Sequence, residues 1–131
     1  MDEVVRRWKP KGRVYFWYEA DRRQGEGWHI AADPGGCDDL EQIVSLARAA
    51  QHPARFTFAS ASAGMVGLTI SFNGAWSADH WVLTDEPVVL SLGDEGLTAL
   101  LDAVSDMRKG DGDYCIGPHD QRIWVWWPPK A

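Results

Sequence analysis

Residues 94–110 read DEGLTALLDAVSDMRKG, and residues 123–129 read IWVWWPP. The first stretch predicts an amphipathic helix, because its apolar residues recur at the spacing of one helical face. These residues are Leu97, Leu100, Leu101, Val104 and Met107. Asp94 and Glu95 suit the positive end of a helix dipole, and Gly110 is typical of the residue that ends a helix.

The second stretch predicts a closing strand, which returns from a short strand at residues 114–116 through a hairpin loop at residues 117–121. Alternation places Ile123, Val125 and Trp127 on one face of this strand, and Trp124 and Trp126 on the other. A strand that is apolar on both faces is either covered twice or exposes one face for recognition. The sequence leaves both alternatives open.

The elements before residue 94 repeat this mixture of strands and helices. The strand at residues 13–18 is aromatic on both faces, with Tyr15 and Trp17 on the same side, and it is expected to form a hairpin with residues 28–32. The turn residues Asp33 to Gly36 are expected to end the strand at residues 28–32. Asp38 would then cap a helix shorter than the later one, with Glu41 completing a capping box. Further strands are expected near residues 55–61, 68–72, 81–83 and 88–92.

This order predicts an α+β fold of two layers. We expect a mostly antiparallel sheet of about six to seven strands, with two helices packed on one of its faces. The length of 131 residues indicates a single domain, residues 1–131, in which residues 1–12 form a basic N-terminal arm. The two halves of the chain each hold a hairpin and a helix, but no fixed-period repeat indicates a duplication.

Composition excludes some classes of function. The chain holds 13 Lys plus Arg and 19 Asp plus Glu, a formal charge of −6, which argues against nucleic-acid binding. No apolar stretch is long enough to span a membrane and the first residues do not resemble a signal peptide, so we expect a cytoplasmic protein with no membrane contact. Cys37 and Cys115 lack metal or redox spacing and are expected to be reduced thiols.

Motifs of the easily recognised enzyme classes are absent from the sequence. It contains no glycine-rich phosphate loop, dinucleotide fingerprint, Gly-x-Ser-x-Gly or His-Glu-x-x-His. No cofactor, no metal and no catalytic residue is therefore predicted, and a non-enzymatic protein is favoured. Cys37 near a helix start lies beside carboxylates that oppose thiolate formation. The Asp111-Gly112-Asp113 run lacks the further ligands of a calcium loop and is expected to be a turn.

The aromatic residues are the strongest functional signal. The chain holds 8 tryptophans, and a domain of this size cannot easily bury them all. The predicted binding residues are Tyr15, Trp17, Trp76, Arg122, Trp124 and Trp126. The favoured hypothesis is an adaptor-like or inhibitor-like interaction module that binds a protein partner or a second copy of itself through an aromatic sheet face. The alternative, in which these residues have no role in recognition, is that loops or a second subunit bury this face.

A second hypothesis is a small ligand-binding protein or enzyme. Trp124 and Trp126 would then form the wall of a pocket, and His80, His119 or Asp120 would supply its polar chemistry. These three residues are predicted in loops. They would form a metal site or an acid/base pair only if those loops met.

Overall fold

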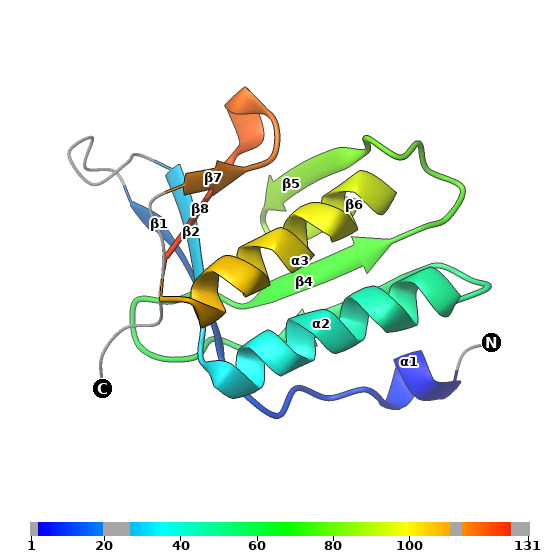
Figure 1. Cartoon of the computed structure of the whole chain (residues 1–131), viewed down its shortest axis with the longest axis horizontal. Coiled ribbons are helices and arrows are strands. Elements are labelled where there is room, and N and C mark those ends of the chain that lie inside the picture. The colour runs from blue at the N-terminus through cyan, green and yellow to red at the C-terminus, as the bar shows by residue number, and fades with distance from the viewer. Residues whose placement is uncertain (1–2, 20–26, 111–113, 127–131) are drawn as a thin grey trace.

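The computed structural model describes residues 3–19, 27–110 and 114–126 (Figure 1). In chain order the elements are α1 (Glu3–Arg7), β1 (Val14–Glu19), β2 (Gly27–Ala32), α2 (Pro34–Ala49), β3 (Ala54–Phe58), β4 (Leu68–Phe72), β5 (Trp81–Asp85), β6 (Val88–Leu92), α3 (Asp94–Arg108), β7 (Tyr114–Ile116), the 3₁₀ helix η2 (His119–Gln121) and β8 (Ile123–Val125). None of the helices in these ranges is long and apolar enough to cross a bilayer.

The described strands form two sheets of four strands each. Sheet A has the order β1-β2-β8-β7, and sheet B has the order β3-β4-β6-β5. The α+β class is confirmed, but the single sheet of six to seven strands is wrong. Each hairpin is antiparallel as predicted, whereas β2–β8 and β4–β6 pair in parallel. The β2–β8 pair joins hairpins far apart in the chain and the β4–β6 pair joins consecutive hairpins, and no turn signal predicts either pairing.

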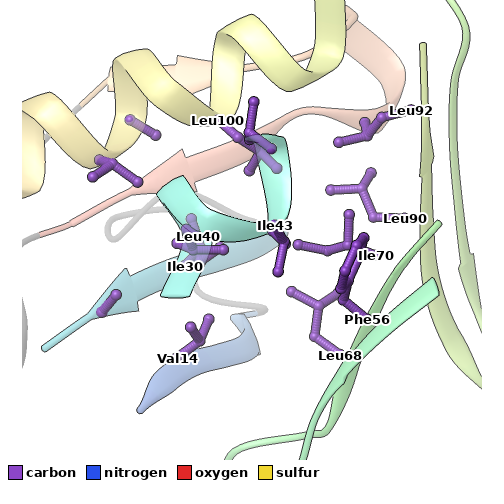
Figure 2. Close-up of a cluster of buried hydrophobic side chains, with 14 of the residues drawn as sticks. Val14, Ile30, Leu40, Ile43, Phe56, Leu68, Ile70, Leu90, Leu92 and Leu100 are labelled. Atoms are coloured by element: carbon purple, nitrogen blue, oxygen red, sulfur yellow. The ribbon is translucent and has the colours of Figure 1, made fainter. Parts of the chain in front are cut away.

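One hydrophobic core joins both sheets to the two long helices. α2 and α3 lie side by side across the strands of sheet B, while sheet A stands at one end of the helices (Figure 1). Figure 2 shows side chains from sheet A, sheet B and both helices directed into this core. Ile30, Leu40, Ile43, Leu90 and Leu100 are among its fully buried members. The buried faces of both sheets therefore meet the helices, and each sheet keeps a second, outer face.

Helix α2 begins earlier than the sequence indicated. Its N-cap is Asp33, whose side chain accepts a hydrogen bond from Gly36 N at 2.7 Å. The predicted cap at Asp38 and the shorter helix are wrong, because Pro34 occupies the first helical turn, where proline is tolerated. Gly36 is needed for a different reason. A Cβ there would overlap the carbonyl oxygen of Arg13, which crosses the helix at this point.

The two halves of the chain have the same topology. Residues 14–72 give β1, β2, α2, β3 and β4, and residues 81–125 give β5, β6, α3, β7 and β8 in the same order. The antiparallel β1–β2 pair corresponds to β5–β6, and the parallel β2–β8 pair corresponds to β6–β4. Each sheet therefore combines the first hairpin of one half with the second hairpin of the other half.

Local contacts repeat between the halves as well. Asp33 N donates to Arg13 O at 3.1 Å before α2, and Gly93 N donates to His80 O at 2.8 Å before α3. Five residues of α2 recur at the same positions of α3. They are Gly36, Leu40, Val44, Ser45 and Arg48, which correspond to Gly96, Leu100, Val104, Ser105 and Arg108. This two-fold repeat lets each position in one sheet be compared with its equivalent in the other.

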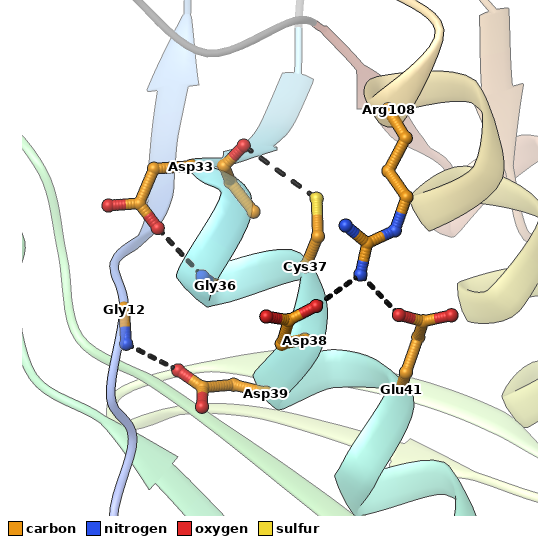
Figure 3. Close-up of polar contacts among 9 residues, drawn as sticks. Gly12, Asp33, Gly36, Cys37, Asp38, Asp39, Glu41 and Arg108 are labelled. Atoms are coloured by element: carbon orange, nitrogen blue, oxygen red, sulfur yellow. Dashed lines mark hydrogen bonds and ion pairs between the residues drawn. The ribbon is translucent and has the colours of Figure 1, made fainter.

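The N-terminal arm lies against the body of the protein. The Trp8 ring makes edge contacts with Phe56 and Phe58, each with centroids 5.4 Å apart, and its Nε1 donates to Gln42 Oε1 at 2.8 Å. Asp39 holds the end of the arm. Its buried carboxylate accepts hydrogen bonds from Lys11 N at 2.9 Å and from Gly12 N at 2.8 Å (Figure 3).

Candidate interaction surface

The outer face of sheet A carries a row of aromatic side chains. Trp17 on β1, His29 on β2 and Trp124 on β8 are paired in register, and Cys115 on β7 continues the row. Residues that are directly paired across neighbouring strands point to the same side of a sheet. A second row on this side holds Tyr15 and Ala31, followed by Trp126 directly after β8.

His29 is the centre of this arrangement. Its ring stacks on Trp17 with centroids 5.3 Å apart and an interplanar angle of 15°, and it lies edge to edge with the Trp126 ring, with centroids 5.8 Å apart and an angle of 20° between the planes. Trp124 lies parallel on the same side, at 6.4 Å and 21°. Trp126 Nε1 also donates a hydrogen bond to His29 Nδ1. We call Tyr15, Trp17, His29, Trp124 and Trp126 the aromatic face.

The ring of His29 is only 2% exposed, whereas the four large aromatic residues around it are half-buried. The Trp124 ring is further covered by the guanidinium of Arg122, whose Cζ lies 4.9 Å from the ring centroid. A cation above an indole is a favourable pair. In the described chain nothing accepts a hydrogen bond from the buried Trp124 Nε1.

The two-fold repeat shows that the equivalent positions of sheet B carry no aromatic residues. The row equivalent to Trp17, His29, Trp124 and Cys115 is formed in sheet B by Thr84, Val89, Thr69 and Thr57. There the Thr57 and Thr69 hydroxyls lie 2.9 Å apart and share a hydrogen bond. Small polar residues thus support the same sheet geometry, which is the ordinary composition of a solvent-facing sheet surface.

The second row differs in the same way. Tyr15, Ala31 and Trp126 correspond to Val82, Ser91 and Ser71 in sheet B. Three large aromatic rings of sheet A therefore stand where sheet B has threonine or serine, and Tyr15 stands where it has valine. Because the backbone pairing is equivalent, the difference between the sheets resides in the side chains.

Four of the six predicted binding residues come together on sheet A, with Arg122 beside them. The sixth, Trp76, lies in the connection between β4 and β5, where its ring stacks on His80 at 4.3 Å and 20°. Sequence reasoning missed His29. Its position opposite Trp17 depends on the β1–β2 register, and the connecting residues 20–26 gave no turn signal that would fix that register.

The alternative pocket residues are distributed differently. A cavity of about 470 Å³ lies between the sheets and is lined by Tyr18, Trp28, Leu83, Asp120 and Arg122, among others. Trp124 and Trp126 are not among its described lining residues. His119 lies in η2, and its side chain is outside the described part of the structure. Among the described side chains, no group of three metal-ligating residues lies together.

A second hollow of about 360 Å³ lies between the start of α2 and the end of α3, beside Cys37, Met107 and Arg108. The Cys37 thiol is buried and points at Ala32 O over 3.9 Å. Burial raises its pKa, which disfavours the nucleophilic thiolate. Figure 3 shows Arg108 reaching Asp38, at 2.6 Å, and Glu41. These hydrogen bonds hold the pKa of Arg108 above its usual value. The Asp111–Asp113 turn lies outside the described residues.

No protein-family model matches this chain, and comparisons with curated proteins and with solved structures found no match either.

Proposed function

We propose that this protein is a non-enzymatic interaction module that binds a protein partner through the aromatic face of sheet A. The observation that supports this proposal is the contrast between the two halves. At equivalent positions sheet B carries Thr84, Thr69 and Ser71 where sheet A carries Trp17, Trp124 and Trp126. Large aromatic side chains that the equivalent sheet lacks, gathered on one half-buried surface, are typical of a recognition surface.

Contacts within the face support the same function. His29 stacks on Trp17 and accepts a hydrogen bond from Trp126, so these side chains already contact one another in the absence of a partner. Pre-ordered aromatic side chains lose little conformational entropy on binding, which is why they dominate the energetics of many protein interfaces.

The test is photo-crosslinking at matched positions in cells of the protein's own host. A benzophenone amino acid replaces Tyr15 in one variant and Val82, the equivalent residue of sheet B, in the other. We expect a discrete adduct from position 15 and none from position 82. The mass of the adduct will distinguish a second copy from a different protein. Equal labelling at both positions, or none at either, would contradict the proposal.

The comparison of the two sheets also supplies a double variant in which the same crosslinking experiment can be repeated. Trp124→Thr and Trp126→Ser install the residues that sheet B carries at the equivalent positions, Thr69 and Ser71. We expect this double variant to fold, as judged by circular dichroism and a cooperative unfolding transition, and to lose the adduct at position 15. Loss of the fold would instead assign both indoles to structural stabilisation.

The cavity beside Asp120 supports a second candidate, the binding of a small ligand. Its volume of about 470 Å³ falls within the range of ligand pockets, and Trp28 and Arg122 offer it an aromatic surface and a cation. A small-molecule mass retained in native mass spectrometry, and lost in a Trp28→Ala variant, would favour this function over the aromatic face.

A further inference from the structure

Charge is unevenly distributed over the fold. Sheet A with η2 and Arg13, residues 13–19, 27–32 and 114–126, carries 2 basic and 2 acidic side chains. The basic residues of the arm lie elsewhere, because α1 and Trp8 pack against α2 and β3. The intervening described residues, 33–110, which form α2, sheet B and α3, carry 4 basic and 11 acidic side chains. Most of the negative charge of the described residues therefore lies away from the sheet that carries the aromatic face.

Two arginines lie at opposite ends of that face. Arg122 directly precedes β8 and covers Trp124, at the end of the sheet where Glu19 pairs with Gly27. Arg13 directly precedes β1, and by strand alternation it is on the side of Tyr15 and Trp17. Six residues of extended chain separate the Arg13 end from the Glu19 end, which corresponds to about 20 Å.

These arginines differ from those of the helices in their partners. Arg48 pairs with Asp94 at 2.8 Å and Arg108 pairs with Asp38 at 2.6 Å. Within the described residues, neither Arg13 nor Arg122 has a carboxylate in ion-pair contact, although the chain holds 19 Asp plus Glu. Arg55, on the outer face of sheet B, likewise makes no ion pair with a described carboxylate and provides a matched control.

We propose, building on the interaction function above, that the partner presents an acidic polypeptide segment. Its apolar side chains cover the aromatic face, and its carboxylates pair with Arg122 at one end and Arg13 at the other. Charge complementarity of this kind sets specificity and association rate more than affinity. The apolar contacts with Trp17, Trp124 and Trp126 supply most of the binding free energy.

Two other occupants fit less well. A second copy docked through the same face would bring two further arginines and Glu19 as the one carboxylate in β1, so at least one arginine of each copy would stay without a carboxylate. A single-stranded nucleic acid would stack well on indole rings, but it adds one negative charge per nucleotide to a protein whose formal charge is −6. A short acidic segment needs only two or three carboxylates to satisfy the exposed arginines.

The experiment is a selection from a displayed library of random peptides about seven residues long, the length that covers the face in an extended conformation. Peptides that bind the wild-type protein are selected, and those that also bind the Trp124→Thr, Trp126→Ser variant are removed. We expect the survivors to combine Asp or Glu with large apolar residues. Their affinity should fall about five-fold or more in Arg122→Glu and several-fold in Arg13→Glu, and should change less than about two-fold in Arg55→Glu.

The outcomes separate this inference from the proposed function. Survivors that are neutral or basic, or that bind Arg122→Glu as well as wild type, would overturn the acidic partner while leaving the aromatic face as a binding surface. Failure to recover any peptide that depends on the two indoles would overturn both. An oligothymidylate that binds more tightly than every selected peptide would replace the polypeptide with a nucleic acid.

Discussion

The guanidinium of Arg48 donates a hydrogen bond to the carboxylate of Asp94 at 2.8 Å, which joins the last turn of α2 to the first residue of α3. At the other end of the helix pair, Arg108 of α3 reaches Asp38 in the first turns of α2. The helices are therefore antiparallel, and each ends in an arginine that contacts the start of the other. The two arginines occupy equivalent positions of the repeat, but the acidic residues that they contact differ.

Arg48→Ala should cost about 0.5 kcal/mol of unfolding free energy, because the Asp94 side chain is 62% exposed and exposed ion pairs contribute little. Arg108→Ala should cost about 1 kcal/mol, since Arg108 has two carboxylate partners. Urea unfolding measures both values. The losses should shrink in about 1 M salt. Arg55→Ala is the control, because Arg55 makes no ion pair with a described carboxylate. An equally large loss of unfolding free energy in this variant would show that the ion pairs of Arg48 and Arg108 are not the cause.

Asp39 stabilises the fold much more strongly than its exposed neighbour Asp38. Its carboxylate is 2% exposed and accepts hydrogen bonds from the backbone N–H groups of Lys11 and Gly12. Asp39→Ala should therefore lose about 2–4 kcal/mol, because it leaves these donors without their charged acceptor. Asp38→Ala should lose about 1 kcal/mol or less.

Trypsin provides a second measurement of the Asp39 contact. Cleavage after Lys11 requires the arm to leave α2, so Asp39→Ala should accelerate it, whereas Asp38→Ala should not. Equal cleavage rates in the two variants would show that Asp39 does not hold the arm. The contacts of Trp8 with Phe56 and Phe58 would then be sufficient to dock it.

Local patterns predicted the two long helices and the hairpins, but neither the short helix α1 nor the assembly of these elements. α3 matches its expected range because its apolar period, acidic start and Gly110 all agree. The start of α2 was predicted too late because Pro34, Gly35 and Gly36 resemble a turn. Gly36 is present because the backbone at Arg13, just before β1, passes close to the helix there, and this is a tertiary contact. The parallel β2–β8 pair likewise depends on contacts between the two halves.

The same limit applies to the candidate surface. Alternation along β1 and β8 is a local property, and it correctly grouped Tyr15 with Trp17 and Trp124 with Trp126. That these two pairs lie on one surface follows only from the insertion of β2 between β1 and β8. Placing β2 there also brings His29 between the indoles, which no sequence period indicates.

Gly117 is required by the contact between the β7–β8 loop and β5. Its φ is +90°, and a Cβ would lie 2.5 Å from the Trp81 ring, which is fixed by a hydrogen bond from Nε1 to Gln121 O at 3.0 Å. Gly117→Ala should therefore cost about 2–4 kcal/mol, from backbone strain and overlap together. Gly64 has φ +83° and nothing within 4 Å of its Cβ position, so Gly64→Ala should cost only about 1–2 kcal/mol. Chemical denaturation measures both, and equal costs would show that Trp81 yields to the added methyl group.

The two thiols should differ strongly in reactivity. Cys115 is exposed, whereas Cys37 is buried and burial raises its pKa. With a disulfide reagent at pH 8, Cys115 should react at an ordinary rate, and Cys37 should react about 100-fold more slowly because it must wait for local opening. A Cys115→Ser variant isolates the slow thiol.

The raised pKa of Cys37 also fixes the direction of a pH effect on stability. Below the ordinary thiol pKa, the folded and unfolded chains both hold the proton, and this group does not alter stability with pH. Above it, the unfolded chain ionises first, so the free energy of unfolding falls as pH rises. Urea unfolding at pH 7 and pH 10 should show a smaller pH-dependent loss in Cys37→Ala than in wild type, while Cys115→Ser should match wild type. The reverse order would mean that Cys37 ionises in the folded protein.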